Sequence, residues 1–178
     1  MSIFAVVGMC GSGKSTATEF LEKNGFSKIR FGQITIDEIK KRNLSVNEKN
    51  EKKIREELRK KHGMAAYAIL NIPKIISLLN KNNNIVLDGL YSWEEYLILK
   101  EEFPEIKIIC IYASPEKRYQ RLSEREIRPL TEEEAFLRDK AEIEKLHKAG
   151  PIAMADHTLI NNKNIPYLES ELRRIING

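Results

Sequence analysis

Short apolar runs alternate along this chain with longer segments in which apolar residues recur at helical spacing. The runs are brief and rich in β-branched residues, which is typical of buried strands. Strands that alternate with helices form parallel sheets covered by helices. The predicted strands are residues 3–7, 29–31, 85–87, 106–112 and 158–160. The pattern therefore predicts an α/β fold with a five-stranded parallel sheet flanked by helices.

Several helix starts carry their own signals. Ser92 and Thr131 each precede a glutamate by three residues, which is the spacing of a capping box. Ser114 is followed by a proline, a residue that favours the first helical position. We therefore expect helices to begin directly after these three residues.

Two segments interrupt the alternation. Residues 43–63 are dense in charge, and this composition is compatible with disorder. However, Ile54 and Leu58 keep an i,i+4 apolar spacing, and residues 45–48 form a possible capping box, so we favour a mobile helical flap. Residues 125–130 contain arginine and proline and predict a short lid. No linker or repeat divides residues 1–178, which we expect to form a single domain.

The bulk properties exclude several classes of protein. The net charge is +4 and the pI is about 9.0, but the basic residues are spread out, so nucleic-acid binding is not indicated. Two cysteines and three histidines lack the spacing of a disulfide framework or a metal site. No apolar stretch has the length of a membrane span. We expect a cytoplasmic protein, and the pattern indicates no oligomeric state.

The first apolar run leads into Gly-Met-Cys-Gly-Ser-Gly-Lys-Ser at residues 8–15, which matches the phosphate-binding loop G-x-x-x-x-G-K-[ST]. Glycines let backbone N–H groups surround a phosphate at the start of a helix. Lys14 is expected to reach the β- and γ-phosphates, and the Ser15 hydroxyl to bind Mg²⁺. The alternative is a glycine-rich turn without a ligand. The predicted nucleotide-binding residues in this loop are Gly8, Gly11, Ser12, Gly13, Lys14, Ser15 and Thr16.

A second candidate site follows the strand at residues 85–87. Asp88 comes at its carboxyl end, where a carboxylate can lie beside Mg²⁺ and its waters. The alternative is that Asp88 only caps a turn, but Ser92 already caps the next helix. With Gly89, it is expected to line the path to the second substrate.

Arginines gather in the second half of the chain. Arg118, Arg121 and Arg125 share one helix face, Arg128 lies in the predicted lid, and Arg138 lies on the next helix. Neighbouring like charges oppose helix formation, so the group is expected to face a transferring phosphoryl group. Ordinary ion pairs with adjacent glutamates are the alternative.

With these motifs in place, the chain resembles the nucleoside monophosphate kinase group, especially adenylate-kinase-related small kinases and dephospho-coenzyme A kinase. The resemblance rests on residues 8–15, 87–89, 114–122 and 155–161. It implies the P-loop NTPase fold, a lid bordered by residues 118–128, Arg118 at the nucleotide, Arg138 at the phosphates, and residues 155–161 at the adenine. In one departure, Gln33 replaces the usual aspartate, and Asp37 is the candidate substitute.

The predicted activity is transfer of the γ-phosphoryl group of ATP, with Mg²⁺, to a small phosphate acceptor. Lys14, Asp37 and the arginines 121, 125, 128 and 138 are the predicted catalytic residues. Arg55 and Arg59, one helical turn apart, are expected to hold an acceptor phosphate. We expect the acceptor to be a nucleoside monophosphate or dephospho-coenzyme A, and favour the nucleotide. The rival function is a nucleotide-dependent binding or regulatory protein without phosphoryl transfer.

Overall fold

The computed structural model describes residues 1–178. Its strands are β1 (Ile3–Val7), β2 (Ser27–Arg30), β3 (Ile85–Asp88), β4 (Lys107–Tyr112) and β5 (His157–Ile160). Its helices are α1 (Lys14–Lys23), α2 (Gln33–Lys41), α3 (Glu48–His62), α4 (Ala66–Leu79), α5 (Trp93–Glu102), α6 (Pro115–Ser123), α7 (Glu132–Glu144), α8 (Ala149–Ala153) and α9 (Ile165–Asn177). Every predicted strand is confirmed, with ends that differ by at most two residues.

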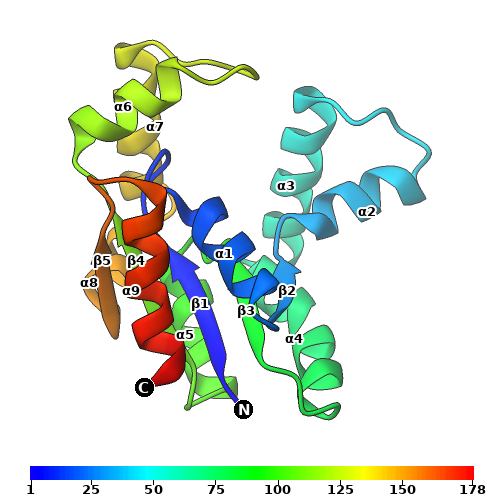
Figure 1. Ribbon diagram of the computed structural model, residues 1–178. Coiled ribbons are helices and arrows are strands. Elements are labelled where there is room, and N and C mark those ends of the chain that lie inside the picture. The colour runs from blue at the N-terminus through cyan, green and yellow to red at the C-terminus, as the bar shows by residue number, and fades with distance from the viewer.

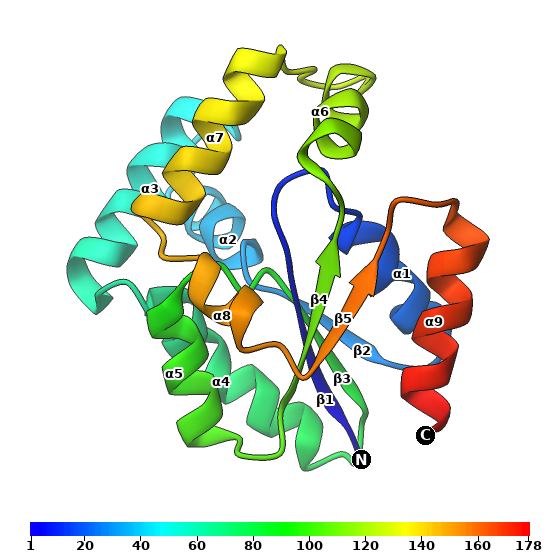
Figure 2. The same ribbon diagram turned by 90° about the vertical axis from the view of Figure 1, so that its left-hand side faces the viewer.

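The strands form one parallel sheet in the order β2-β3-β1-β4-β5. Alternate residues of each strand point to opposite faces, so two cores form. Ala5 and Leu87 belong to the core under α4 and α5, whereas Val6 and Val86 belong to the core under α1 and α9. Figure 2 shows α5 and α9 on opposite sides of the sheet. The predicted α/β fold, a parallel sheet flanked by helices, is confirmed.

The predicted helix starts are confirmed after Ser92, Ser114 and Thr131, and Thr131 with Glu134 makes a complete capping box. Ser92 accepts a hydrogen bond from the Glu95 backbone N–H, but the Glu95 carboxylate accepts from Tyr91 N–H instead of closing the box. The capping box predicted at residues 45–48 is wrong. Helix α3 begins at Glu48, because the Asn47 side chain accepts from the Asn50 N–H and caps it.

The two interrupting segments flank the carboxyl edge of the sheet. The charged excursion contains α3, in which Ile54 is buried and Leu58 packs against the larger core. The predicted lid, residues 125–130, is an exposed irregular segment between α6 and α7. Figure 1 shows α2 and α3 on one side of this edge and α6 and α7 on the other. No single helix is long and apolar enough to cross a membrane.

Candidate functional site

The loop between β1 and α1 has a backbone that requires glycine. Gly8, Gly11 and Gly13 have φ angles of 149°, 80° and 102°, where side chains are strained. A Cβ at Gly11 would lie 2.8 Å from the Arg118 carbonyl oxygen, and one at Gly13 would run into the Asn161 side-chain amide. The turn is therefore fixed both by torsion and by close packing around it.

Two polar groups of this loop, the Ser12 hydroxyl and the Lys14 ammonium, are suited to bind an anion. The Ser12 hydroxyl is buried and has no hydrogen-bond partner, an arrangement that costs free energy in the absence of a bound group. The Lys14 ammonium donates to the Met9 carbonyl oxygen at 2.9 Å, back across the loop. Burial, reinforced by the positive charge of Lys148, lowers the pKa of Lys14 to about 8. An anion in the loop would satisfy both groups.

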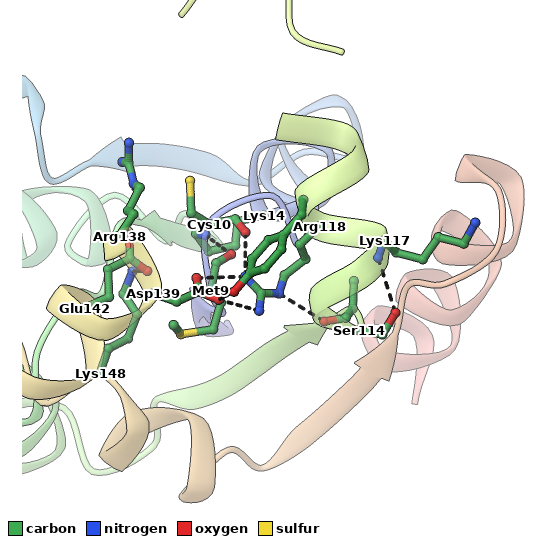
Figure 3. A network of polar contacts seen from close by, with 12 residues as sticks. Met9, Cys10, Lys14, Ser114, Lys117, Arg118, Arg138, Asp139, Glu142 and Lys148 are labelled. Carbon is green, nitrogen blue, oxygen red and sulfur yellow. Dashed lines mark hydrogen bonds and ion pairs between the residues drawn. The ribbon is translucent and has the colours of Figure 1, made fainter. Parts of the chain in front are cut away.

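Arg118 differs from its predicted role at the nucleotide. Its guanidinium is buried and forms a two-pronged ion pair with Asp139 of α7, at 2.8 and 2.6 Å. It also donates to the carbonyl oxygens of Cys10 and Ala113, at 3.2 Å each. Figure 3 shows Arg118 between the loop and α7. Because the guanidinium N–H groups of Arg118 are already hydrogen-bonded within the protein, Arg118 stabilises the phosphate loop and is not free to bind a nucleotide.

The end of β5 also supports the loop. Asn161 is buried, and its side-chain amide donates to the Ser12 carbonyl oxygen at 2.8 Å. Arg121 donates to the Asn161 carbonyl oxygen at 2.8 Å, and its other terminal nitrogen is buried without a partner. Arg121 thus lies beside the nucleotide loop with one donor unused.

The rest of the segment expected at the adenine lies elsewhere. Asp156 precedes β5 and accepts a hydrogen bond from the Ile108 N–H, next to the first residue of β4. In a parallel sheet this is the amino edge, opposite the phosphate loop. Residues 155 and 156 are therefore not part of the nucleotide site, and only Asn161 of this segment reaches it.

Asp88 lies at the carboxyl end of β3, where the register pairs it with Val6 of β1 and Arg30 of β2. Burial raises its pKa, while the charges of Arg30, Lys28 and Lys14 oppose the rise. It is thus a carboxylate beside the phosphate loop, as predicted. Gly89 is buried at φ 115°, and a Cβ at this position would meet the Tyr91 ring. It does not line the large cavity at this edge, so the predicted role of Gly89 on the path to the second substrate is wrong.

A cavity of about 890 Å³ lies between the two segments that flank the carboxyl edge of the sheet. Residues of α2, α3 and α7 line it, together with Tyr91 and Arg128 of the lid. Its cationic lining residues are Arg30, Arg55, Arg59, Arg128, Arg138 and Lys145, and its acidic ones are Glu48, Glu51 and Glu142. The cavity therefore suits an anionic small molecule, and we call it the acceptor cavity.

The arginines of the acceptor cavity differ in how free they are. Arg55 pairs with Glu48 at 2.7 Å and with Glu51 at 3.3 Å. Arg59 makes no ion pair; its Nε is buried without a partner and its guanidinium lies over the Tyr67 ring. Arg59 is thus the donor of α3 that remains available to a ligand.

The lid contacts the flap across the mouth of the acceptor cavity. Arg128 of the lid pairs with Glu48 of α3 at 3.0 Å, although both side chains are more than half exposed. Arg138 of α7 lies 3.6 Å from Glu142 and lines the same cavity. The structure therefore brings Arg59, Arg128 and Arg138 around one cavity.

Two predicted site residues, Arg125 and Asp37, lie outside the acceptor cavity. Arg125 is exposed and does not line the acceptor cavity. Asp37 is exposed on α2, where it accepts a hydrogen bond from the Gln33 amide at 2.8 Å. The two side chains lie on one face of α2, but Asp37 is one turn further from the start of the helix, so Gln33 lines the cavity and Asp37 does not. In this structure Asp37 does not replace the missing aspartate.

Sequence reasoning missed three ionisable residues here. Lys148 is buried, pairs with Glu142 at 2.8 Å, and lies over the Tyr91 ring. Glu95 is fully buried, and burial raises its pKa to about 7. Nothing in the local sequence pattern indicates that Lys148 or Glu142 is buried. Glu95, in contrast, occupies the N3 position of the capping motif that begins at Ser92, and this signal was available in the sequence.

The donor set of this edge fits a nucleotide with Mg²⁺. The glycine loop, the unpartnered Ser12 hydroxyl and Lys14 suit phosphate oxygens, and the exposed Ser15 at the start of α1 suits a cation held with Asp88. No group of three or more histidine, cysteine or carboxylate side chains forms a separate metal site. This arrangement is typical of P-loops, in which phosphate oxygens supply the remaining ligands.

Comparisons with known proteins agree with this geometry. The family described as AAA domain matches residues 5–147. A UPF0200 protein of Thermococcus kodakarensis is 35% identical over 178 residues, which cover 98% of this chain and 96% of that protein. A UPF0200 protein of Pyrococcus furiosus is 32% identical, with 98% and 95% covered.

Solved structures show the same fold at low identity. A shikimate kinase from Bacteroides thetaiotaomicron superposes with a TM-score of 0.62 at 15% identity, covering 99% of this chain and 97% of that one. A sugar kinase from a Janibacter species gives 0.62 at 12% identity, covering 99% and 95%. The comparisons support the P-loop kinase-like group and do not single out nucleoside monophosphate kinases or dephospho-coenzyme A kinase. With its AAA domain and the fold of small P-loop kinases, the chain belongs to the UPF0200 family.

Proposed function

We propose that this protein transfers the γ-phosphoryl group of ATP to a small nucleotide-like acceptor. The observation that carries the proposal is the cationic cavity of about 890 Å³, which is lined by α2, the flap and α7. It lies at the same edge of the sheet as the phosphate loop, because the carboxyl end of β2 contributes Arg30 to its lining. Two substrates need two adjoining spaces, one for the donor phosphates and one for the acceptor. A nucleoside monophosphate or dephospho-coenzyme A has the negative charge that Arg59 and its neighbours would bind.

The residues of the loop would hold the donor. The backbone N–H groups of residues 8–13 and the Lys14 ammonium bind phosphate oxygens, and Ser15 and Asp88 hold Mg²⁺. When bound, Mg²⁺ neutralises negative charge on the phosphates. Arg128 and Arg138, at the edge of the acceptor cavity, stabilise charge on the transferring group. Residues 125–130 would close over the site and exclude water.

The test is an ADP-release assay across ribo- and deoxyribonucleoside monophosphates and dephospho-coenzyme A, with products identified by mass. We expect one acceptor to raise ADP release above background hydrolysis. ATP binding without acceptor-stimulated ADP release would instead support the nucleotide-dependent binding protein.

A variant then links the activity to the acceptor cavity. Arg59→Met should raise the acceptor KM by about 10- to 100-fold, since a charge-assisted hydrogen bond is lost, while ATP affinity stays the same. Arg174→Met is the matched control, because Arg174 is an exposed arginine paired with Glu171 on α9. An unchanged acceptor KM in Arg59→Met would remove Arg59 from the site.

A further inference from the structure

One carboxylate of the acceptor cavity lies close to the phosphate loop. Glu142 of α7 lines the cavity, and its side chain is only 12% exposed. It accepts from the Lys148 ammonium at 2.8 Å and lies 3.6 Å from Arg138 Nε. Figure 3 shows Glu142, Lys148 and Arg138 together beside the loop residues Met9 to Lys14.

The other acidic residues of the cavity are placed differently. Glu48 and Glu51 lie on α3, tied to Arg55 on the flap. The carboxylates that raise the pKa of Lys14 most are Glu142 and Asp88, and neither Glu48 nor Glu51 is among them. Asp88 is already assigned to Mg²⁺, and Asp37 lies outside the cavity. Of the cavity carboxylates, Glu142 is therefore the one that lies near Lys14, the residue expected to contact the transferring phosphoryl group.

The environment of Glu142 keeps it ionised. Burial alone would raise its pKa, but the charge and hydrogen bond of Lys148, with the charges of Lys14 and Arg138, lower it below the ordinary value. A carboxylate held in this form accepts hydrogen bonds and donates none. It would attract a neutral hydroxyl and repel the anionic oxygen of an acceptor phosphate.

We propose that Glu142 is a catalytic residue that orients an acceptor hydroxyl, so that the substrate is an anion whose nucleophile is an alcohol oxygen. This inference rests on the proposed phosphotransferase function and narrows its acceptor class. Arg59 holds the anionic group of the acceptor at the α3 side of the cavity. Glu142 holds the hydroxyl at the side of the phosphate loop.

The step balances as follows in atoms and charge. The alcohol oxygen forms a bond to the γ-phosphorus, and the bond from that phosphorus to the β–γ bridging oxygen breaks. ADP leaves with the electron pair of that bond. The hydroxyl proton passes along its hydrogen bond to Glu142 and then to solvent, so each transfer releases one proton. Transfer to an ionised phosphate oxygen would release none.

The first measurement uses the wild-type protein with dephospho-coenzyme A and the nucleoside monophosphates. Phosphorus NMR of the product separates a new phosphate monoester from a diphosphate, and a pH-stat at pH 8 counts protons per ADP. We expect a monoester and one proton. A diphosphate product overturns the role of Glu142 while leaving the phosphotransferase intact, whereas no product from any acceptor overturns both proposals.

The second measurement uses Glu142→Gln, which keeps the shape and removes the charge. We expect kcat to fall about 100-fold, with ATP affinity and acceptor KM changed less than about threefold. Glu142→Asp should recover part of the loss. Glu144→Gln, on the exposed face of α7, should behave as wild type. If Glu142→Gln binds ATP normally and keeps wild-type kcat, or if it loses only ATP affinity, Glu142 does not orient the nucleophile.

Discussion

Removing the carboxylate of Asp139 should destabilise the whole protein and loosen the phosphate loop. Arg118 and Asp139 are both buried, and two hydrogen bonds of 2.8 and 2.6 Å join them. The Tyr119 hydroxyl donates to the same carboxylate at 3.0 Å. Burial lowers the pKa of Arg118, but the hydrogen bond and charge of Asp139 outweigh it and raise that pKa. A guanidinium is not deprotonated in proteins, so Arg118 stays charged even when Asp139, which raises its pKa, is removed.

The magnitude follows from this uncompensated charge. Breaking a buried ion pair by removing one partner costs about 3–5 kcal/mol. For a chain of this length, each kcal/mol lowers Tm by about 2–4 °C, so Asp139→Asn should lower Tm by about 6–20 °C. The same change frees Arg118 from its fixed position against the Cys10 carbonyl oxygen, so ATP affinity should fall as well.

The assay is urea denaturation and ATP titration of Asp139→Asn, Arg118→Met and the double variant. The two residues are in contact, so we expect the double variant to lose less stability than the sum of the single losses. Arg118→Met alone also leaves two carbonyl oxygens without a donor, so the double variant should not return to wild-type stability. Additive losses, or an Asp139→Asn variant within about 1 kcal/mol of wild type, would refute this account of the pair.

Two further substitutions in the loop test its electrostatics and its backbone. The pKa of Lys14 is lowered from 10.5 to about 8, so the unfolded chain binds more protons between these values and wild-type stability rises with pH through this window. Lys14→Met should therefore abolish phosphoryl transfer and yet stabilise the protein at pH 7, by up to about 3 kcal/mol. Urea denaturation at pH 7 and pH 10.5 should show this advantage disappear at the higher pH; an equal difference at both would contradict the lowered pKa. Gly13→Ala should abolish ATP binding in a calorimetric titration, because φ is 102° and the new Cβ would displace Asn161. Wild-type ATP affinity in this variant would show that the loop does not need its present shape.

The features that sequence predicts well here are the ones that neighbouring residues determine. The strands follow from short β-branched runs, the loop from a fixed motif, and the start of α7 from the capping box of Thr131 and Glu134. The two wrong local predictions also have local causes. Asn47, and not Ser45, caps α3. Asp37 lies on the same helix as Gln33, one turn further along, but outside the cavity lining.

The features that sequence misses depend on packing between distant segments. The resemblance to small kinases implies Arg118 at the nucleotide, but the position of α7 brings Asp139 to it, 21 residues later in the chain. Lys148 follows a stretch with no motif and becomes buried because α8 places it over Tyr91. Tertiary contacts, which periodicity does not report, decide which charges are buried and which remain free to bind a ligand.

The support that Asn161 gives to the phosphate loop has a consequence for synthesis of the protein. The sequence of the loop is complete at residue 15. The side-chain amide that binds the Ser12 carbonyl oxygen belongs to Asn161, which comes 149 residues after Ser12. At about 5–20 residues per second, a ribosome needs about 7–30 s to cover that distance. During this interval the nascent chain carries the motif without the contact that fixes its shape. The ability to bind nucleotide would thus mark a chain that has been translated through β5.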